Sequence, residues 1–90
     1  MSNDGILITN RFFMAVDLLK DNGRMQGGLK EFCERHDINR SWLSFVKNNA
    51  KKSPLRAEII KWLCDDYGVS VDYLLWGKGS ILKKTTTANK

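Results

Sequence analysis

The sequence predicts an all-α protein whose five helices form one domain. Apolar residues recur at the three- and four-residue spacing of helix faces, and no stretch shows the strict alternation of a β-strand. A length of 90 residues suits a single domain with its own core. We expect this domain to span residues 9–82, after a flexible N-terminus at 1–8. The tail at 83–90 is polar and lacks periodicity, so we expect it to be disordered.

The first helix is expected from about Thr9 to Asp21. Asn22-Gly23 should end it, because glycine readily adopts the left-handed backbone found at helix C-termini. Its apolar face consists of Phe12, Ala15, Val16 and Leu19, widened by Phe13 and Met14. Gly27-Gly28 then forms a flexible connector, since it lacks the preceding strand and the following Lys-Ser/Thr pair of a phosphate-binding loop.

Two short helices, about Leu29 to His36 and Arg40 to Asn49, are predicted on either side of a tight turn. Asp37 tolerates a left-handed backbone better than most residues other than glycine. Asn39 can cap the next helix through its side-chain oxygen. The apolar positions are Leu29, Phe32, Cys33 and His36 in the first of these helices and Leu43 and Val46 in the second. Short capped helices at a fixed angle are therefore expected here.

A fourth and a fifth helix complete the domain. Ser53-Pro54 should open the fourth helix, with the hydroxyl as cap and proline at the first position, where its missing N–H costs little. Gly68 should end that helix, and Ser70 should cap the fifth, with Asp72 near the positive end of its dipole. The apolar positions are Leu55, Ile59, Ile60, Trp62 and Leu63, then Val71, Leu74 and Leu75.

The third helix leaves one face polar, and such a face can enter the major groove of DNA. Arginine can chelate the edge of guanine, serine can bond to several bases, and an aromatic ring can pack on a thymine methyl group. The positions on this face are Arg40, Ser41, Ser44, Phe45 and Asn48. For this helix taken alone, an ordinary solvated surface explains the pattern equally well.

The charge pattern favours the DNA interpretation. The stretch from Asn39 to Arg56 carries a charge of +5, equal to the net charge of the whole chain, and contains no acidic residue. The residues before it are close to neutral, and Ala57 to Trp76 is acidic overall. A basic stretch that coincides with a candidate recognition helix is expected for contacts to phosphate. Its basic residues are Arg40, Lys47, Lys51, Lys52 and Arg56.

From Phe32 to Lys47 the chain resembles the helix-turn-helix family of phage repressors and Cro proteins, often called XRE-type. Residues 67–75, followed by Gly77, resemble that family's junction between its fourth and fifth helices. The similarity covers about Leu29 to Gly77. It implies a five-helix, lambda-repressor-like DNA-binding domain in a small transcriptional regulator of phage or mobile-element type. Such proteins bind double-stranded DNA, usually as two-fold dimers.

The resemblance also implies roles for single residues. The family's base-reading positions match Arg40, Ser41, Ser44 and Phe45, and its phosphate-contacting positions match Asn48, Lys51 and Lys52. Leu29 stands where the family usually has a phosphate-contacting glutamine, so that contact is lost or passes to Lys30.

Two further departures concern the third helix itself. Lys47 replaces a common acidic residue, so it either pairs with Asp17 or Asp21 or contacts phosphate. Trp42 replaces a small residue. It can pack on the preceding helix, lie against the sugar-phosphate backbone or hinder docking, and packing is the outcome we favour.

The residues after the fifth helix are too apolar for a free tail. Trp76, Ile81 and Leu82 are therefore a candidate dimer patch, with folding back onto the core as an equally good alternative.

Other chemistries have weaker support. Cys33, Cys64 and His36 are the only cysteines and histidine, without C-x-x-C spacing, so we expect buried reduced thiols, no metal site and no cofactor. Ser41, His36 and Asp37 lie on opposite sides of the predicted turn without a nucleophile elbow, so we do not expect an enzyme or a small-molecule substrate. No signal peptide or spanning apolar run is present, which predicts a cytoplasmic protein without a membrane partner.

The main alternative is a protein-interaction module, such as an antitoxin or accessory factor, that keeps this fold but binds another protein. A domain of that kind would have no reason to keep the stretch from Asn39 to Arg56 clear of acids. RNA is a third candidate ligand, but the chain lacks the motifs of common RNA-binding modules.

Overall fold

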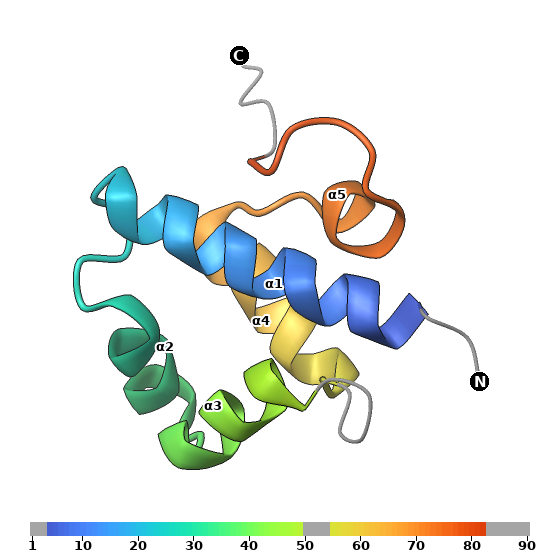
Figure 1. Ribbon diagram of the computed structural model, residues 1–90. Coiled ribbons are helices and arrows are strands. Elements are labelled where there is room, and N and C mark those ends of the chain that lie inside the picture. Colours follow the sequence, from blue (N-terminus) through green and yellow to red (C-terminus); the bar gives the residue numbers. More distant parts are fainter. Residues whose placement is uncertain (1–3, 50–54, 83–90) are drawn as a thin grey trace.

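The computed structural model describes residues 4–49 and 55–82, and within these ranges it contains helices and no strand (Figure 1). The predicted all-α class is thereby confirmed. The helices are α1 (Asp4–Asp21), α2 (Gly28–His36), α3 (Arg40–Asn48), α4 (Ala57–Tyr67) and α5 (Val71–Trp76). The tail at 83–90 lies outside the described residues.

The helix α1 organises the domain. Figure 1 shows it running across α4, with α2 and α3 on one side and α5 on the other, and its backbone contacts α2, α3 and α5. The core between the helices is apolar, and its burial removes hydrocarbon surface from water. Its fully buried large side chains include Phe12, Leu19, Met25, Phe32, Leu43, Ile59, Leu63 and Leu74.

The first helix begins at Asp4, five residues earlier than predicted. Residues 4–8, which the sequence analysis assigned to the N-terminal segment, therefore belong to α1. Thr9 is completely buried, and its hydroxyl donates a 2.7 Å hydrogen bond to the carbonyl oxygen of Gly5. Asp4 places a negative charge at the positive end of the helix dipole. The extra turn is thus stabilised by a buried polar contact that apolar periodicity does not report.

The turn between α2 and α3 has the predicted chemistry. Asp37 adopts a left-handed backbone, with φ 54° and ψ 47°, and its N–H donates to the carbonyl oxygen of Cys33. Asn39 is extended, and its side-chain oxygen accepts a 2.9 Å hydrogen bond from the N–H of Trp42. Both predictions for this turn are confirmed, so α3 leaves α2 at an angle set by these two residues.

The helix α4 begins later than predicted. Arg56 is extended at its N-cap, and the first helical residue is Ala57. Ser53 and Pro54, which were predicted to cap and to open this helix, lie outside the described residues. Gly68 ends α4 with φ 73°, and the Ser70 hydroxyl caps α5 by accepting from the N–H of Tyr73, both as predicted.

Arg11 fixes α5 against α1. Its guanidinium donates hydrogen bonds of 3.2 Å to the carbonyl oxygens of Leu74 and Leu75, at the C-terminal end of α5. A cation at that end also complements the helix dipole. Gly77 follows with φ 70°, and a Cβ added there would lie 2.9 Å from the Arg11 guanidinium. This close approach and the positive φ both require glycine.

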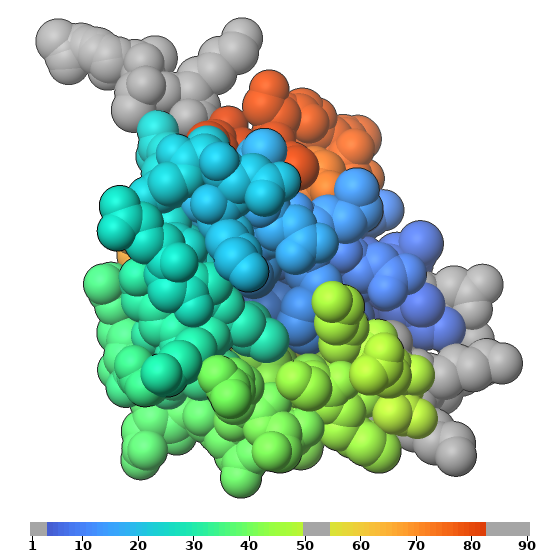
Figure 2. Space-filling model, turned by 60° about the vertical axis from the view of Figure 1, so that its left-hand side comes forward, coloured from blue at the N-terminus to red at the C-terminus, as the bar shows by residue number. Residues whose placement is uncertain are grey.

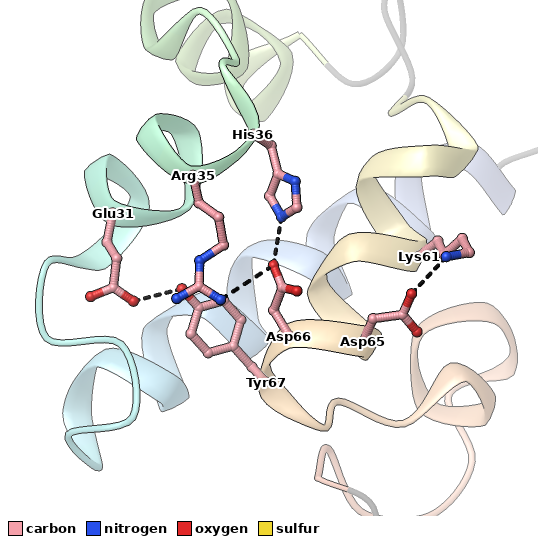
Figure 3. Close-up of polar contacts among 7 residues, drawn as sticks. All are labelled: Glu31, Arg35, His36, Lys61, Asp65, Asp66 and Tyr67. Atoms are coloured by element: carbon pink, nitrogen blue, oxygen red, sulfur yellow. Dashed lines mark hydrogen bonds and ion pairs between the residues drawn. The ribbon is translucent and has the colours of Figure 1, made fainter.

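A hydrogen bond between Glu31 and Tyr67 joins α2 to α4 (Figure 3). The Tyr67 hydroxyl donates to the Glu31 carboxylate over 2.6 Å, and the carboxylate also accepts from the N–H of Gly27. These two donated bonds, the first above all, hold the pKa of Glu31 below its usual value. Burial, and then the Glu31 partner, raise the pKa of Tyr67 to about 12. Tyr67 therefore stays neutral and keeps donating at ordinary pH.

His36 makes a second link between the same helices. Its ring stacks on Trp62, with centroids 4.3 Å apart and planes within 4°, and its Nε2 lies 2.5 Å from a carboxylate oxygen of Asp66. Arg35 lies 3.7 Å from that same oxygen (Figure 3). The polar side chains between α2 and α4 thus have partners within the protein, and they hold α2, and with it the turn to α3, in place.

Candidate nucleic-acid interface

The helix α3 is anchored by one face and exposed by the other. Leu43 and Val46 are completely buried, while Figure 2 shows α3 forming one edge of the molecule beside α2. Its exposed residues are Arg40, Ser41, Ser44, Phe45, Lys47 and Asn48. The buried pair fixes how the helix is rotated, so the exposed face has one defined orientation.

The four predicted base-reading residues lie together on this exposed face. Arg40, Ser41, Ser44 and Phe45 follow the spacing that places residues four apart one above the other on a helix. Phe45 keeps 49% of its surface exposed, although it is a large apolar residue. The face therefore offers a cation, two hydroxyl groups and an aromatic ring to a ligand, and carries no acidic side chain of its own.

Arg40 borders a hollow of about 330 Å³ between α2 and α3, together with Lys30. The same hollow is lined by Glu34 and Asp37, so two carboxylates lie close to these two cations. The charge count along the sequence missed this, because both acids belong to α2 and its turn rather than to α3. None of the ion pairs among the described residues involves Arg40 or Lys30.

Cys33 also lines the hollow beside Arg40. Burial raises the pKa of the Cys33 thiol, and the positive charge of Arg40 opposes this effect only in part. The thiol is therefore neutral at ordinary pH, and it serves as part of the core, as predicted. Cys64 is likewise a buried thiol.

The two asparagines at the end of α3 bond to their own helix. Asn48 donates to the carbonyl oxygen of Ser44 over 3.3 Å, and Asn49 donates to that of Phe45 over 2.9 Å. These bonds satisfy carbonyl groups near the helix end. Asn48, a predicted phosphate contact, thus already uses one of its donors, while Lys51 and Lys52 lie outside the described residues.

Lys47 points toward α1 rather than to a carboxylate. Its ammonium nitrogen lies 5.6 Å from the centre of the Phe13 ring, within the range of a cation–π interaction. Neither Asp17 nor Asp21 forms an ion pair with it among the residues that the structure describes. The ion pair between Lys47 and an acidic residue of α1, one of the two options from the sequence, is therefore not observed. Lys47 contacts an aromatic ring instead.

Trp42 packs against the core, and its ring also faces a residue that is distant along the sequence. The Arg56 guanidinium carbon lies 4.9 Å from the centre of the Trp42 ring. Arg56 also places its Nε 3.6 Å from a carboxylate oxygen of Glu58. Only the fold brings Arg56 to α3.

The candidate dimer patch does not form one exposed surface. Ile81 and Leu82 are half-buried against the core, and the N–H of Ser70 donates a 2.7 Å hydrogen bond to the carbonyl oxygen of Ile81. Leu82 forms an isolated antiparallel bridge with Val69. Trp76, in contrast, keeps 62% of its surface exposed. Two of the three residues, Ile81 and Leu82, thus fold back onto the core.

The described part of the chain also bears on metal binding and on membrane insertion. No three His, Cys, Asp or Glu side chains lie close enough there to hold a metal ion. None of the five helices is long and apolar enough to cross a membrane. His36 is held between Trp62 and Asp66 rather than beside Ser41.

The exposed face of α3 is therefore the site that combines a fixed orientation with side chains suited to a ligand. Its composition matches hydrogen bonding and apolar contact with base edges. Arg40 and Lys30 lie at one edge with Glu34 and Asp37, and Arg56 lies beside Trp42 and Glu58, so each of these cations has a carboxylate nearby. Comparisons with family models, with curated proteins and with solved structures each gave no match.

Proposed function

We propose that this chain binds double-stranded DNA sequence-specifically and acts as a small transcriptional regulator, with α3 in the major groove. The observation that carries the proposal is the exposed face of α3, which places Arg40, Ser41, Ser44 and Phe45 side by side while Leu43 and Val46 anchor the helix. The left-handed turn at Asp37 and the Asn39 cap set α3 against α2. These features agree with the resemblance to phage repressors and Cro proteins.

The exposed residues divide into two roles. Arg40, Ser41, Ser44 and Phe45 read base edges, because their groups can chelate guanine, bond to several bases and pack on a thymine methyl group. Lys30 and Asn48, with Lys51 and Lys52, contact phosphate and set the register without reading sequence. This division predicts that variants of the first group change sequence preference and that variants of the second group change the response to salt.

Dimerisation belongs to the same proposal, because two-fold regulators of this type bind half-sites about one DNA turn apart. Of the candidate patch, only Trp76 is largely exposed, since Ile81 and Leu82 pack on the core. We therefore expect a dimer contact to centre on Trp76. Sedimentation of Trp76→Ala tests this, and an unchanged mass relative to a dimeric wild type would exclude that contact.

A protein-binding role is the second candidate, favoured by an apolar hollow of about 240 Å³ between α4 and α5. Val71, at its edge, is 42% exposed. The hollow is lined by Ala57, Ile60, Lys61, Cys64, Asp65, Val71 and Leu75. This surface belongs to different helices from the DNA face, so the two functions predict different binding residues.

An amide-shift titration of labelled protein with a mixed-sequence duplex tests the proposal. At low salt we expect shifts to cluster on α3 and the start of α2, and to shrink at about 0.2 M salt because phosphate contacts release counterions. Selection from random duplexes should then enrich one sequence. If no amide shifts at low salt, or if the shifts fall on α4 and α5, binding of DNA through α3 is wrong.

A further inference from the structure

Arg56 and Trp42 form a cation–π pair that joins the start of α4 to the first turn of α3. The guanidinium carbon lies 4.9 Å from the centre of the indole ring. Trp42 is half-buried against the core, so its ring is held in place, whereas the Arg56 side chain keeps 56% of its surface exposed. A fixed aromatic surface thus carries a cation that solvent can reach.

We propose that Trp42 is a positioning residue that holds Arg56 as a phosphate clamp beside α3, an inference that rests on the proposed DNA binding. The Arg56 side chain is more than half exposed beside this ring, so its N–H donors remain within reach of a ligand. Two such donors match two oxygens of one phosphate group. The contact with Trp42 therefore restricts where the Arg56 guanidinium lies before the ligand arrives.

The Arg56–Trp42 pair lies on the side of α3 opposite to the hollow that Arg40 borders. Trp42 lies three residues before Phe45, so both occupy the same side of α3. Lys30 and Arg40 share the hollow at the α2 side of the helix. Cations thus lie on both sides of α3, with Glu34 and Asp37 beside the first group and Glu58 beside Arg56. Phosphates line both walls of a major groove about 12 Å wide, so cations on each side of the helix can reach them.

Glu58 competes for the same guanidinium. Its carboxylate lies 3.6 Å from the Arg56 Nε, and the two side chains keep about half of their surface exposed. An ion pair this exposed contributes little free energy, so a phosphate can replace the carboxylate. Glu58→Gln removes the competing carboxylate and does not alter either partner of the Arg56–Trp42 contact. It should therefore tighten binding to every duplex, most strongly at low salt.

The test is a double-mutant cycle with Trp42→Leu, Arg56→Gln and the double variant, on the duplex that the wild-type chain selects. Binding is followed by fluorescence anisotropy between about 0.05 and 0.2 M salt. Loss of one phosphate contact should lower the slope of log affinity against log salt by about 0.9, which is on the order of tenfold in affinity at 0.1 M salt. Trp42→Leu should lower the slope in part, and the double variant should match Arg56→Gln.

Further variants separate positioning from simple stability. Trp42→Phe keeps an aromatic face and should restore the slope that Trp42→Leu loses, while Trp42→Met fills the space without an aromatic face and should not. Arg24→Gln, at an exposed arginine in the loop before α2, is the matched charge control. Thermal melting followed by circular dichroism identifies any variant whose fold has changed.

The outcomes distinguish failure of the proposed phosphate clamp from failure of the proposed DNA binding. If the salt-dependence slopes of wild type and Arg56→Gln are equal, or if the losses in affinity add in the double variant, Arg56 held by Trp42 is not a phosphate clamp. The proposed DNA binding is unaffected by either result. Restoration by Trp42→Met as well as by Trp42→Phe shows a packing role and also overturns the clamp. If the wild-type chain binds no duplex at low salt, the proposed DNA binding is wrong, and the phosphate clamp is wrong with it.

Discussion

The exposed face of α3 and the contact between α2 and α4 use similar polar residues for opposite purposes. Between α2 and α4, Glu31 bonds to Tyr67, and His36 lies between Trp62 and Asp66. On α3, Arg40 and Ser44 point into solvent, and the buried residues beneath them are purely apolar. Polar groups that the protein pairs internally hold the fold, whereas polar groups held rigidly but exposed are available to a ligand. Substitutions should therefore separate the two regions by what they change.

The largest expected effect concerns the anchor of α3. Leu43→Ala should lower the free energy of unfolding by roughly 2 to 5 kcal/mol, because it removes a completely buried side chain and leaves a cavity. Ser44→Ala, at the next position and exposed, should change it by less than about 0.5 kcal/mol. Urea unfolding followed by circular dichroism measures both. A similar loss in the two variants would mean that the division of α3 into anchor and exposed face is wrong.

The contribution of the contact between α2 and α4 to the free energy of unfolding should decrease at high pH. The pKa of Tyr67 is raised from 10.0 to about 12, so its stabilising effect is complete below pH 10 and is lost as the pH rises toward 12. A shift of this size corresponds to roughly 2 to 3 kcal/mol. Chemical unfolding of wild type and Tyr67→Phe between pH 8 and about pH 12 isolates this contribution from that of the lysines. Parallel curves for the two proteins would exclude it.

An intermediate effect is expected for Arg40, and on binding rather than on stability. Arg40→Ala should weaken binding to the selected duplex by roughly 1 to 3 kcal/mol and relax the preference at one base pair. Arg24→Ala removes the same charge from the α1–α2 loop and should weaken binding far less. Anisotropy titrations on the selected duplex and on single-base variants measure both. If Arg40→Ala weakens all sequences equally, Arg40 is a phosphate contact and not a base reader.

The smallest expected effect belongs to Lys30, at the edge of the α3 surface. Lys30→Gln should leave sequence preference unchanged and reduce the slope of log affinity against log salt by about 1, as expected for one lost phosphate contact. Lys78→Gln, at an exposed lysine just after α5, provides the control. If Lys30→Gln and wild type have equal slopes of log affinity against log salt, Lys30 does not contact phosphate.

The sequence by itself determined the features that depend on neighbours within a few residues. The all-α class, the left-handed Asp37, the Asn39 and Ser70 caps and the end of α4 at Gly68 all agree with the structure. Capping groups and backbone preferences act across three or four residues, so the local sequence contains what they need. The composition of the exposed α3 face was predictable for the same reason, because helical spacing alone assigns its residues to one side.

Only the tertiary structure decided which distant residues meet. Nothing in local spacing indicates that Arg56 lies over Trp42, that Lys47 lies over Phe13 or that Arg11 caps the end of α5. The same holds for Met25, a buried residue in a loop, and for the early start of α1 around buried Thr9. These contacts depend on how the helices pack, and packing selects among many partners of similar chemistry by shape and burial. A sequence pattern cannot report that selection, since it records distance along the chain and not in space.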